Sequence, residues 1–197
     1  RFVSFMPKTK EYSLQKQHNI TTEYRGNSIL DFAMNSLYDS NQIVMLNEHF
    51  RCHPSIINFS NEAFYFKGLN IMKLTPSSHQ NSNQFFEKVK GKRSTDGVNK
   101  KEINYIIQEI REIIDKEALL SRKMKTKIGV ISPFRNQADA VAKAFTDSFT
   151  SEEISKHRLR CSTPYSFQGQ ERDVIFISLS LDDKSHGSAF AYINKED

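Results

Sequence analysis

"KIGVISPFRNQADAVAKAFTDSF", residues 127–149, places a strand pattern directly before a helix pattern. The first part is a short apolar run with β-branched residues, and Pro133 ends it because proline cannot donate to a strand ladder. In residues 136–149, alanine, valine and phenylalanine recur at the spacing of one helix face. A strand that leads straight into a helix is the building unit of an α/β fold.

The segments on either side continue this alternation. Residues 99–120 predict a long helix with charged residues opposite one apolar stripe. Residues 158–163 predict a short strand, and residues 173–181 form an apolar run typical of a central parallel strand. The order predicts a doubly wound α/β sheet, which binds ligands at the carboxyl ends of its strands. The stripe of the long helix consists of Ile103, Ile106, Ile107, Ile110, Ile113 and Ile114.

Two further helices are predicted in the N-terminal half. The first covers residues 27–39, with Asn27 or Ser28 as N-cap and Asp31 in the capping-box position relative to Ser28. The second begins at Pro54, because a proline in the first helical turn needs no N–H.

The other N-terminal segments carry weaker patterns. Residues 42–46 (QIVML) predict a buried strand, and residues 85–89 (FFEKV) are a candidate strand. Residues 67–84 are rich in turn formers and predict a loop. Residues 1–26 are polar with weak periodicity, so we interpret them as a lead-in segment that is a polar surface or only partly ordered.

The composition is that of a globular protein. The 197 residues are 38% hydrophobic and 26% charged, enough for one domain with a full core or for two small ones. A net charge of +5 is compatible with a polyanionic partner without requiring one. The chain starts with Arg1 rather than Met, and we interpret it as a fragment of a longer protein.

Cysteine usage and hydropathy predict a cytoplasmic, intracellular setting. Cys52 and Cys161 lie far apart, which does not fit the disulfide framework of a secreted protein. No apolar run approaches the roughly 18 residues of a membrane span, and the start lacks a signal-peptide core. We therefore expect no membrane partner.

Three polar loops follow predicted strands, at residues 47–54, 132–137 and 163–172. We expect them to lie on one edge of the sheet, because the carboxyl ends of parallel strands meet there. They carry Arg51, Arg135 and Arg172, and guanidinium groups are common partners of phosphate oxygens. No glycine-rich phosphate loop occurs in the chain, so it does not cradle a nucleotide in that way by itself.

The first loop also contains His49, Cys52 and His53, which raises two other interpretations. A zinc site would need four ligands in short-spaced pairs, and the distant His157 and Cys161 do not complete one cleanly. A thiol–imidazole pair is disfavoured because adjacent side chains diverge. We therefore predict no metal site.

Three stretches together resemble the second RecA-like domain of superfamily 1 helicases. They are "LNEHFRCHPSIINFSNEAFY" (46–65), "IGVISPFRNQ" (128–137) and "STPYSFQGQERDVIFIS" (162–178). The first is similar to the family's motif IV, Q-Y-R-M-H-P, and the third to motif V, T-x-x-x-F-Q-G-x-E-x-D. The branch is that of the nonsense-mediated-decay RNA helicase and the Okazaki-fragment nuclease-helicase.

The resemblance implies roles for the motif IV residues. Phe50 takes the place of the aromatic that lies against the adenine, and Arg51 that of the catalytic arginine that reaches the γ-phosphate. His49, Phe50 and Cys52 depart from the family's Gln, Tyr and Met, while the arginine is retained.

For motif V, the resemblance places Gln168, Gly169 and Glu171 beside the nucleotide. Thr163 and Ser166 match positions that contact the nucleic-acid backbone. Arg135 and Asn136 are further candidates for phosphates of the strand. Asn99 and Glu102 echo a family N-x-x-E feature that we interpret as structural.

The implied fold is α/β: a RecA-like parallel sheet of the P-loop NTPase type, flanked by helices in three layers. Residues 27–197 would form this domain, ending before motif VI. The implied cofactors are ATP and Mg²⁺, bound mainly by a first RecA-like domain outside the sequence.

The implied activity of the full protein is ATP-dependent helicase action on single-stranded DNA or RNA, by a monomer. Alone, the fragment would be inactive. Two alternatives stay open: a non-catalytic nucleic-acid-binding or scaffold module, and a nucleotide-dependent enzyme of unrelated chemistry on the same fold.

Overall fold

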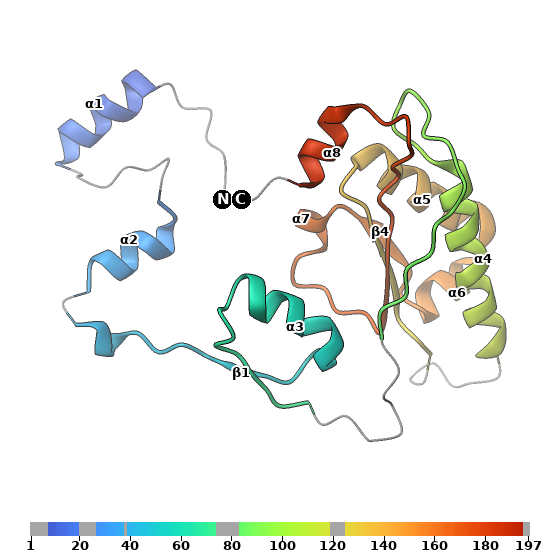
Figure 1. Ribbon diagram of the computed structural model, residues 1–197, viewed down its shortest axis with the longest axis horizontal. Helices are drawn as coiled ribbons and strands as arrows, with labels where there is room; N and C mark the ends of the chain where they lie inside the picture. The colour runs from blue at the N-terminus through green and yellow to red at the C-terminus, as the bar shows by residue number, and fades with distance from the viewer. Residues whose placement is uncertain (1–7, 20–26, 38, 74–82, 119–124, 195–197) are drawn as a thin grey trace. The chain divides into compact units, whose positions relative to one another are not determined.

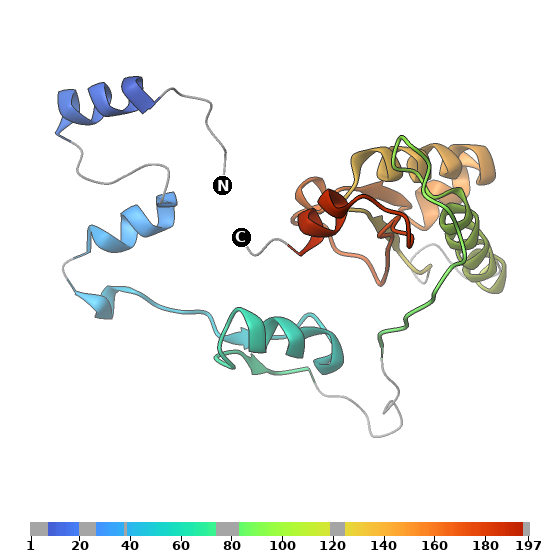
Figure 2. The same cartoon turned by 45° about the horizontal axis from the view of Figure 1, so that its top comes forward.

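The computed structural model describes residues 8–19, 27–37, 39–73, 83–118 and 125–194. The chain divides into two compact units, Arg1–Phe85 and Phe86–Asp197, which we call the N-terminal and the C-terminal unit. Figures 1 and 2 trace both along the chain. No helix in the described part is long and apolar enough to cross a membrane.

A three-stranded parallel sheet organises the C-terminal unit. Its strands are β3 (Ile128–Ile131), β4 (Arg160–Ser162) and β5 (Val174–Ile177), in the order β4-β3-β5. Val130 of β3 aligns with Cys161 of β4 and with Phe176 of β5, so these side chains share one face. The predicted parallel α/β sheet is confirmed. Among the described strands, however, the central one is β3, and the expectation that residues 173–181 form a central strand was wrong.

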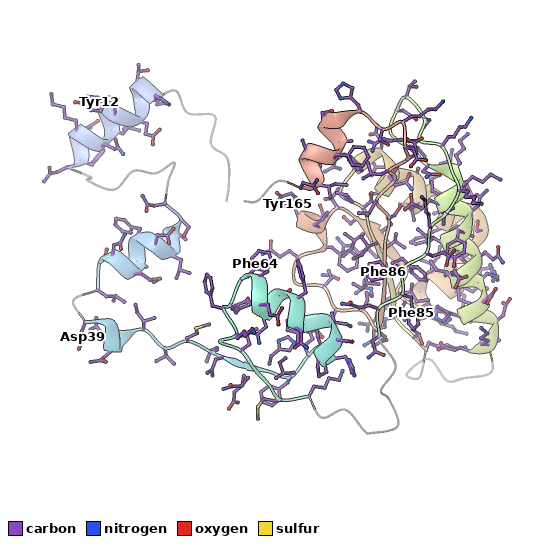
Figure 3. All side chains as sticks on the ribbon, in the orientation of Figure 1. Tyr12, Asp39, Phe64, Phe85, Phe86 and Tyr165 are labelled. Atoms are coloured by element: carbon purple, nitrogen blue, oxygen red, sulfur yellow. The ribbon has the colours of Figure 1, made fainter. Side chains whose placement is uncertain are left out.

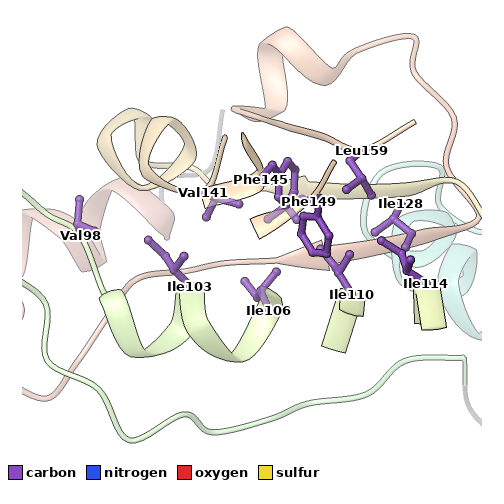
Figure 4. Close-up of a cluster of buried hydrophobic side chains, with 11 residues drawn as sticks. Val98, Ile103, Ile106, Ile110, Ile114, Ile128, Val141, Phe145, Phe149 and Leu159 are labelled. Atoms are coloured by element: carbon purple, nitrogen blue, oxygen red, sulfur yellow. The ribbon is translucent and has the colours of Figure 1, made fainter. Parts of the chain in front are cut away.

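Two helices cover one face of this sheet. α4 (Lys100–Lys116) begins at Asn99, whose side chain accepts the Glu102 backbone N–H, and α5 (Arg135–Ser148) follows β3. Figure 4 shows the buried isoleucines of α4 pointing toward Phe145 and Phe149. Both predicted helices are thus confirmed over their described residues. The core cluster consists of Val98, Ile103, Ile106, Ile110, Ile114, Ile128, Val130, Val141, Phe145, Phe149 and Leu159.

The opposite face of the sheet is crossed by the connection between β4 and β5. Because these two strands lie on either side of β3, the connecting chain passes over β3, and it forms the short helix α7 (Pro164–Phe167). Phe167 is buried against Gly129 in the middle of β3. A Cβ atom at Gly129 would lie 2.5 Å from Phe167 Cζ. The glycine is therefore required by the close approach of the crossing segment.

Two further short helices complete the C-terminal unit. α6 (Ser151–Lys156) has a capping box formed by Thr150 and Glu153, and α8 (Gly187–Ile193) follows β5. Arg111 of α4 joins α6 through an ion pair with Glu153 at 2.5 Å. Neither helix is predicted from the pattern, because each is too short to show an apolar period.

Replacing Gly129 by alanine is expected to destabilise the chain by about 1–3 kcal/mol, because the added methyl group overpacks against a buried ring. Urea unfolding of the 197-residue chain measures this change. Gly187→Ala is the matched control, because a Cβ there meets no atom within 4 Å. Adding Phe167→Leu to Gly129→Ala should recover part of the loss relative to the sum of the two single changes. An unchanged midpoint in Gly129→Ala would contradict the packing described here.

The N-terminal unit contains a strand–helix–strand unit. β1 (Glu48–His49) and β2 (Asn70–Ile71) are parallel, with Glu48 aligned to Asn70, and α3 (Pro54–Ala63) connects them. α3 begins at Pro54 as predicted. Asn61 of α3 fixes the return of the chain, since its side chain accepts the Leu69 N–H at 2.9 Å.

Upstream of this unit lie two helices and a 3₁₀ turn. α2 (Ile29–Asn35) has Ser28 as N-cap in a capping box with Asp31, which confirms the predicted helix. A 3₁₀ turn, η1, spans Ser40–Gln42. α1 (Lys8–His18) lies within the segment that we interpreted as a lead-in that is a polar surface or only partly ordered.

Three segments in or next to the N-terminal unit differ from the prediction. Residues 43–47 form no strand, Val44 and Leu46 are 81% and 89% exposed, and the strand starts at Glu48. Residues 85–89 are irregular. The predicted loop 67–84 contains β2, while residues 74–82 lie outside the described part. Short apolar runs do not distinguish a strand from an extended exposed segment, and two-residue strands are below the reach of periodicity.

Candidate functional site

The loop between β1 and α3 presents Phe50 and Arg51. β1 ends at His49 and α3 begins at Pro54, so only four residues connect them. Phe50 is 64% exposed, and Arg51 is exposed as well. The short loop between β1 and α3 thus carries an exposed aromatic ring and an exposed guanidinium group on consecutive residues.

Two histidines hold this loop. His49 Nε2 accepts the Cys52 backbone N–H at 2.9 Å, which closes the turn around Arg51. His53 is the N-cap of α3, and its Nδ1 accepts the Ser55 backbone N–H at 3.2 Å. His53 Nε2 is buried and has no hydrogen-bond partner among the described residues. These contacts give both histidines a role as support for the loop.

The same contacts argue against the metal interpretation. Lone pairs of His49 Nε2 and His53 Nδ1 already accept backbone N–H groups, so those atoms are not free to bind a metal. Within the described residues, no group of three or more potential metal ligands comes together. Burial raises the pKa of Cys161 to about 12, which disfavours the thiolate form that a zinc site would need.

The carboxyl end of β3 carries the second predicted loop. Ser132 is fully buried, and its Oγ accepts the Phe134 N–H at 3.3 Å, which turns the chain into α5. Arg135 and Asn136 are exposed in the first turn of α5, and Asn136 Nδ2 donates to the Asp96 carbonyl at 2.7 Å. No acidic residue lies in this first turn. An arginine at a helix N-terminus gives the loop a positive potential that suits a phosphate.

A buried polar network fixes this edge of the sheet. Gln137 is fully buried; its Oε1 accepts the Asn99 N–H and its Nε2 donates to Ser178 Oγ, both at 2.9 Å. The Glu102 carboxylate accepts the Ser180 N–H at 2.9 Å, and burial raises its pKa. The network ties the starts of α4 and α5 to the residues after β5. It gives Asn99 and Glu102 contacts that fit the structural role expected for them.

The third predicted loop begins at the carboxyl end of β4. Thr163 precedes α7, and its Oγ1 lies 3.4 Å from Ser166 Oγ, so two hydroxyl groups face each other across one helical turn. Gln168 ends α7 and is exposed, as are Gly169 and Glu171. Gly169 has a φ of +76°, a conformation that favours glycine and lets the chain reverse.

The structure brings together part of the expected edge. Residues 132–137 and Thr163 follow the neighbouring strands β3 and β4 of one parallel sheet, as predicted. Arg172 does not lie at this edge: it precedes β5, and its Nε donates to the Arg158 carbonyl ahead of β4. The crossing connection carries it to the amino ends of the strands. Residues 47–54 belong to the separate β1-β2 sheet of the N-terminal unit, so their predicted place at the same edge stays a prediction.

Two features of the C-terminal unit were not identified from the sequence. Tyr165 on α7 is 74% exposed between Thr163 and Ser166 and is labelled in Figure 3. Its position within "TPYSFQG" was the available signal, because an exposed aromatic suits base stacking. Arg93 lies with its Cζ 4.0 Å from the Phe134 ring centroid. No sequence pattern links residues so far apart.

Parallel strands flanked by helices, with polar loops at their carboxyl ends, define a RecA-like α/β domain. The chain belongs to the AAA domain family AAA_12, whose model matches residues 26–195.

Individual relatives are helicases by name. The chain is 29% identical to Helicase sen1 of Schizosaccharomyces pombe over 163 residues, 77% of this chain and 9% of that protein. It is 30% identical to Helicase SEN1 of Saccharomyces cerevisiae over 161 residues, 73% of this chain and 7% of that protein. It is 28% identical to a mov-10-B.1 protein of Danio rerio over 169 residues, 76% of this chain and 16% of that protein. The chain therefore spans a small part of each relative and is part of a superfamily 1 helicase domain similar to theirs.

Proposed function

We propose that the protein containing this chain is an ATP-dependent helicase or translocase that moves along single-stranded nucleic acid. Within superfamily 1, we place it in the branch of the nonsense-mediated-decay RNA helicase and the Okazaki-fragment nuclease-helicase. The observation that carries the proposal is the exposed Phe50–Arg51 pair on a strand-to-helix loop, inside a family match that covers residues 26–195.

In this proposal, Arg51 is the catalytic arginine. Its guanidinium would stabilise the negative charge that develops on the transferred γ-phosphoryl group. Phe50 would lie against the adenine, and its 64% exposure leaves a ring face available for that contact. The His49 and His53 hydrogen bonds support this role because they hold the loop's backbone. The side chains of Phe50 and Arg51 remain exposed to solvent.

The residues that would contact the nucleotide from motif V are Gln168, Gly169 and Glu171. All three are exposed and follow α7 directly. Because the chain lacks a glycine-rich phosphate loop, ATP and Mg²⁺ would be held mainly by a first RecA-like domain elsewhere in the protein. That domain is the expected intramolecular partner, and the protein would act as a monomer.

The strand contacts would lie at the carboxyl edge of the three-stranded sheet. Thr163 and Ser166 offer short hydroxyl groups for the phosphate backbone, and Arg135 and Asn136 offer donors at the start of α5. Such contacts serve DNA and RNA alike. Movement would follow from closure of the two RecA-like domains around ATP.

The test of this function is ATP turnover with and without a single-stranded oligonucleotide. We expect the full protein to hydrolyse ATP faster with the oligonucleotide, and the purified 197-residue chain to hydrolyse none, because the phosphate loop lies outside it. Oligonucleotide-stimulated turnover by the 197-residue chain would contradict the assignment of ATP binding to another domain. A full protein that binds the oligonucleotide but never hydrolyses ATP would favour the non-catalytic module.

A further inference from the structure

A cluster of arginines lies at the amino ends of the strands, on the face that the β4–β5 connection crosses. Arg160 is the first residue of β4, and Gly129 of β3 lies beside it in register. Arg172 reaches the same place from the start of β5. The guanidinium carbons of Arg160 and Arg172 lie 6.0 and 5.5 Å from the centroid of Phe167, which packs over Gly129.

These guanidinium groups are held in place by main-chain acceptors. Arg160 Nη2 donates to the Ser166 carbonyl at 3.0 Å. Arg172 Nε donates to the Arg158 carbonyl at 3.1 Å, and Arg172 Nη1 to that of Glu171 at 2.7 Å. Carbonyl acceptors orient the groups but do not neutralise their positive charge as a carboxylate would.

The charges of the cluster act on one another. Burial first, and then the nearby Arg160 and Arg158, lower the pKa of Arg172, while Asp173 raises it. The Asp173 carboxylate also accepts the Lys127 backbone N–H at 2.8 Å. A set of oriented cations with this excess of positive charge favours an anionic ligand.

Arg158 provides a separate observation. It has a φ of +46° and occupies the position after the C-cap of α6, where glycine is preferred. The hydrogen bonds of the Schellman motif are present, from Arg158 N–H to the Ser155 carbonyl and from Leu159 N–H to the Ile154 carbonyl. A side chain in this left-handed conformation is strained relative to glycine. The fold itself therefore does not favour an arginine there.

We infer that Arg158, Arg160 and Arg172 form a second binding site for the phosphate backbone of single-stranded nucleic acid. The inference rests on the proposed function and extends it. Arg160 is hydrogen-bonded to Ser166, one of the proposed strand contacts, so α7 joins the two sites. The exposed Tyr165 lies on the same short helix, next to Ser166.

The test uses the full protein and a fluorescently labelled single-stranded oligonucleotide over a series of KCl concentrations. Arg158→Glu with Arg160→Glu is expected to weaken binding about tenfold or more and to reduce the salt slope by about 1.4, the contribution of two phosphates. Arg158→Lys with Arg160→Lys is the matched control and should keep most of the slope.

Arg158→Gly separates binding from folding. It should weaken oligonucleotide binding while leaving the unfolding temperature equal to or above that of the wild type. An unchanged salt slope in the double glutamate variant, with normal stimulated turnover, would overturn the second site and leave the proposed function intact. The second site would also be overturned if the double glutamate variant lost binding to polyglutamate while its oligonucleotide binding was unchanged. That result would assign the cluster to an acidic peptide. A wild-type protein without strand-stimulated turnover would instead overturn the proposed function.

Discussion

Replacing Arg51 by alanine in the full protein is expected to reduce the rate of ATP hydrolysis by about 10³-fold or more, the effect typical of an arginine that stabilises phosphoryl transfer. Strand binding should remain largely intact, because the proposed strand contacts lie on other residues. Arg51→Lys should restore little activity, since an ammonium group lacks the two-pronged geometry of the guanidinium. Steady-state turnover at saturating oligonucleotide measures the effect.

A matched control for this prediction is Lys67→Ala. Lys67 is an exposed cation of the same unit, and its side chain pairs only loosely with Glu62 at 3.9 Å. Removing it should change neither turnover nor strand binding, because exposed ion pairs contribute little. Wild-type turnover in Arg51→Ala would refute the role assigned to Arg51.

Replacing Ile110 by alanine is expected to destabilise the chain by about 2–5 kcal/mol. Ile110 is fully buried in the cluster formed by α4, the sheet and α5, where a smaller side chain leaves a cavity. Urea or thermal unfolding of the 197-residue chain measures this change. This loss of unfolding free energy would be large, since many domains have a total stability of only about 5–15 kcal/mol.

The matched control is Ile107→Ala on the same helix. Ile107 is only partly buried at the edge of the cluster, so the same substitution should cost clearly less. Equal losses at the two positions would contradict the packing of α4 through the face that carries Ile110.

The C-terminal unit was largely predictable because its elements carry strong local signals. α4 has an apolar stripe over several turns, an N-cap at Asn99 and charged residues on its outer face. β3 joins a β-branched run to a helix through Pro133. The apolar residues of each of these elements pack into the core cluster, so the predicted elements match the observed ones.

The errors have different physical causes. Residues 42–46 and 85–89 each contain a short apolar run. Whether such a run pairs as a strand depends on partner strands that a local pattern does not contain. The position of β5 at the edge of the described sheet depends on strand order, which no single strand encodes. Arg172 was placed at the wrong edge because the connection from β4 to β5 crosses the whole sheet.

The residues of the candidate site could be proposed from the sequence, but much of the geometry around them could not. Phe50 and Arg51 are next to each other in the sequence, so their placement on one loop follows directly. The Gln137 network joins residues about 40 positions apart, and Arg93 reaches Ser180 over 87 positions. Such contacts arise from the fold and leave no spacing pattern in the sequence.

The central claim is that the full protein uses ATP to move along a single strand. The most direct measurement is the release of streptavidin from an end-biotinylated oligonucleotide by the full protein, with free biotin as a trap. We predict release with ATP and Mg²⁺, no release with a non-hydrolysable ATP analogue, and none by Arg51→Ala with ATP. Release that is equal with and without ATP, or no release by a wild-type protein that hydrolyses ATP on the strand, would contradict the claim.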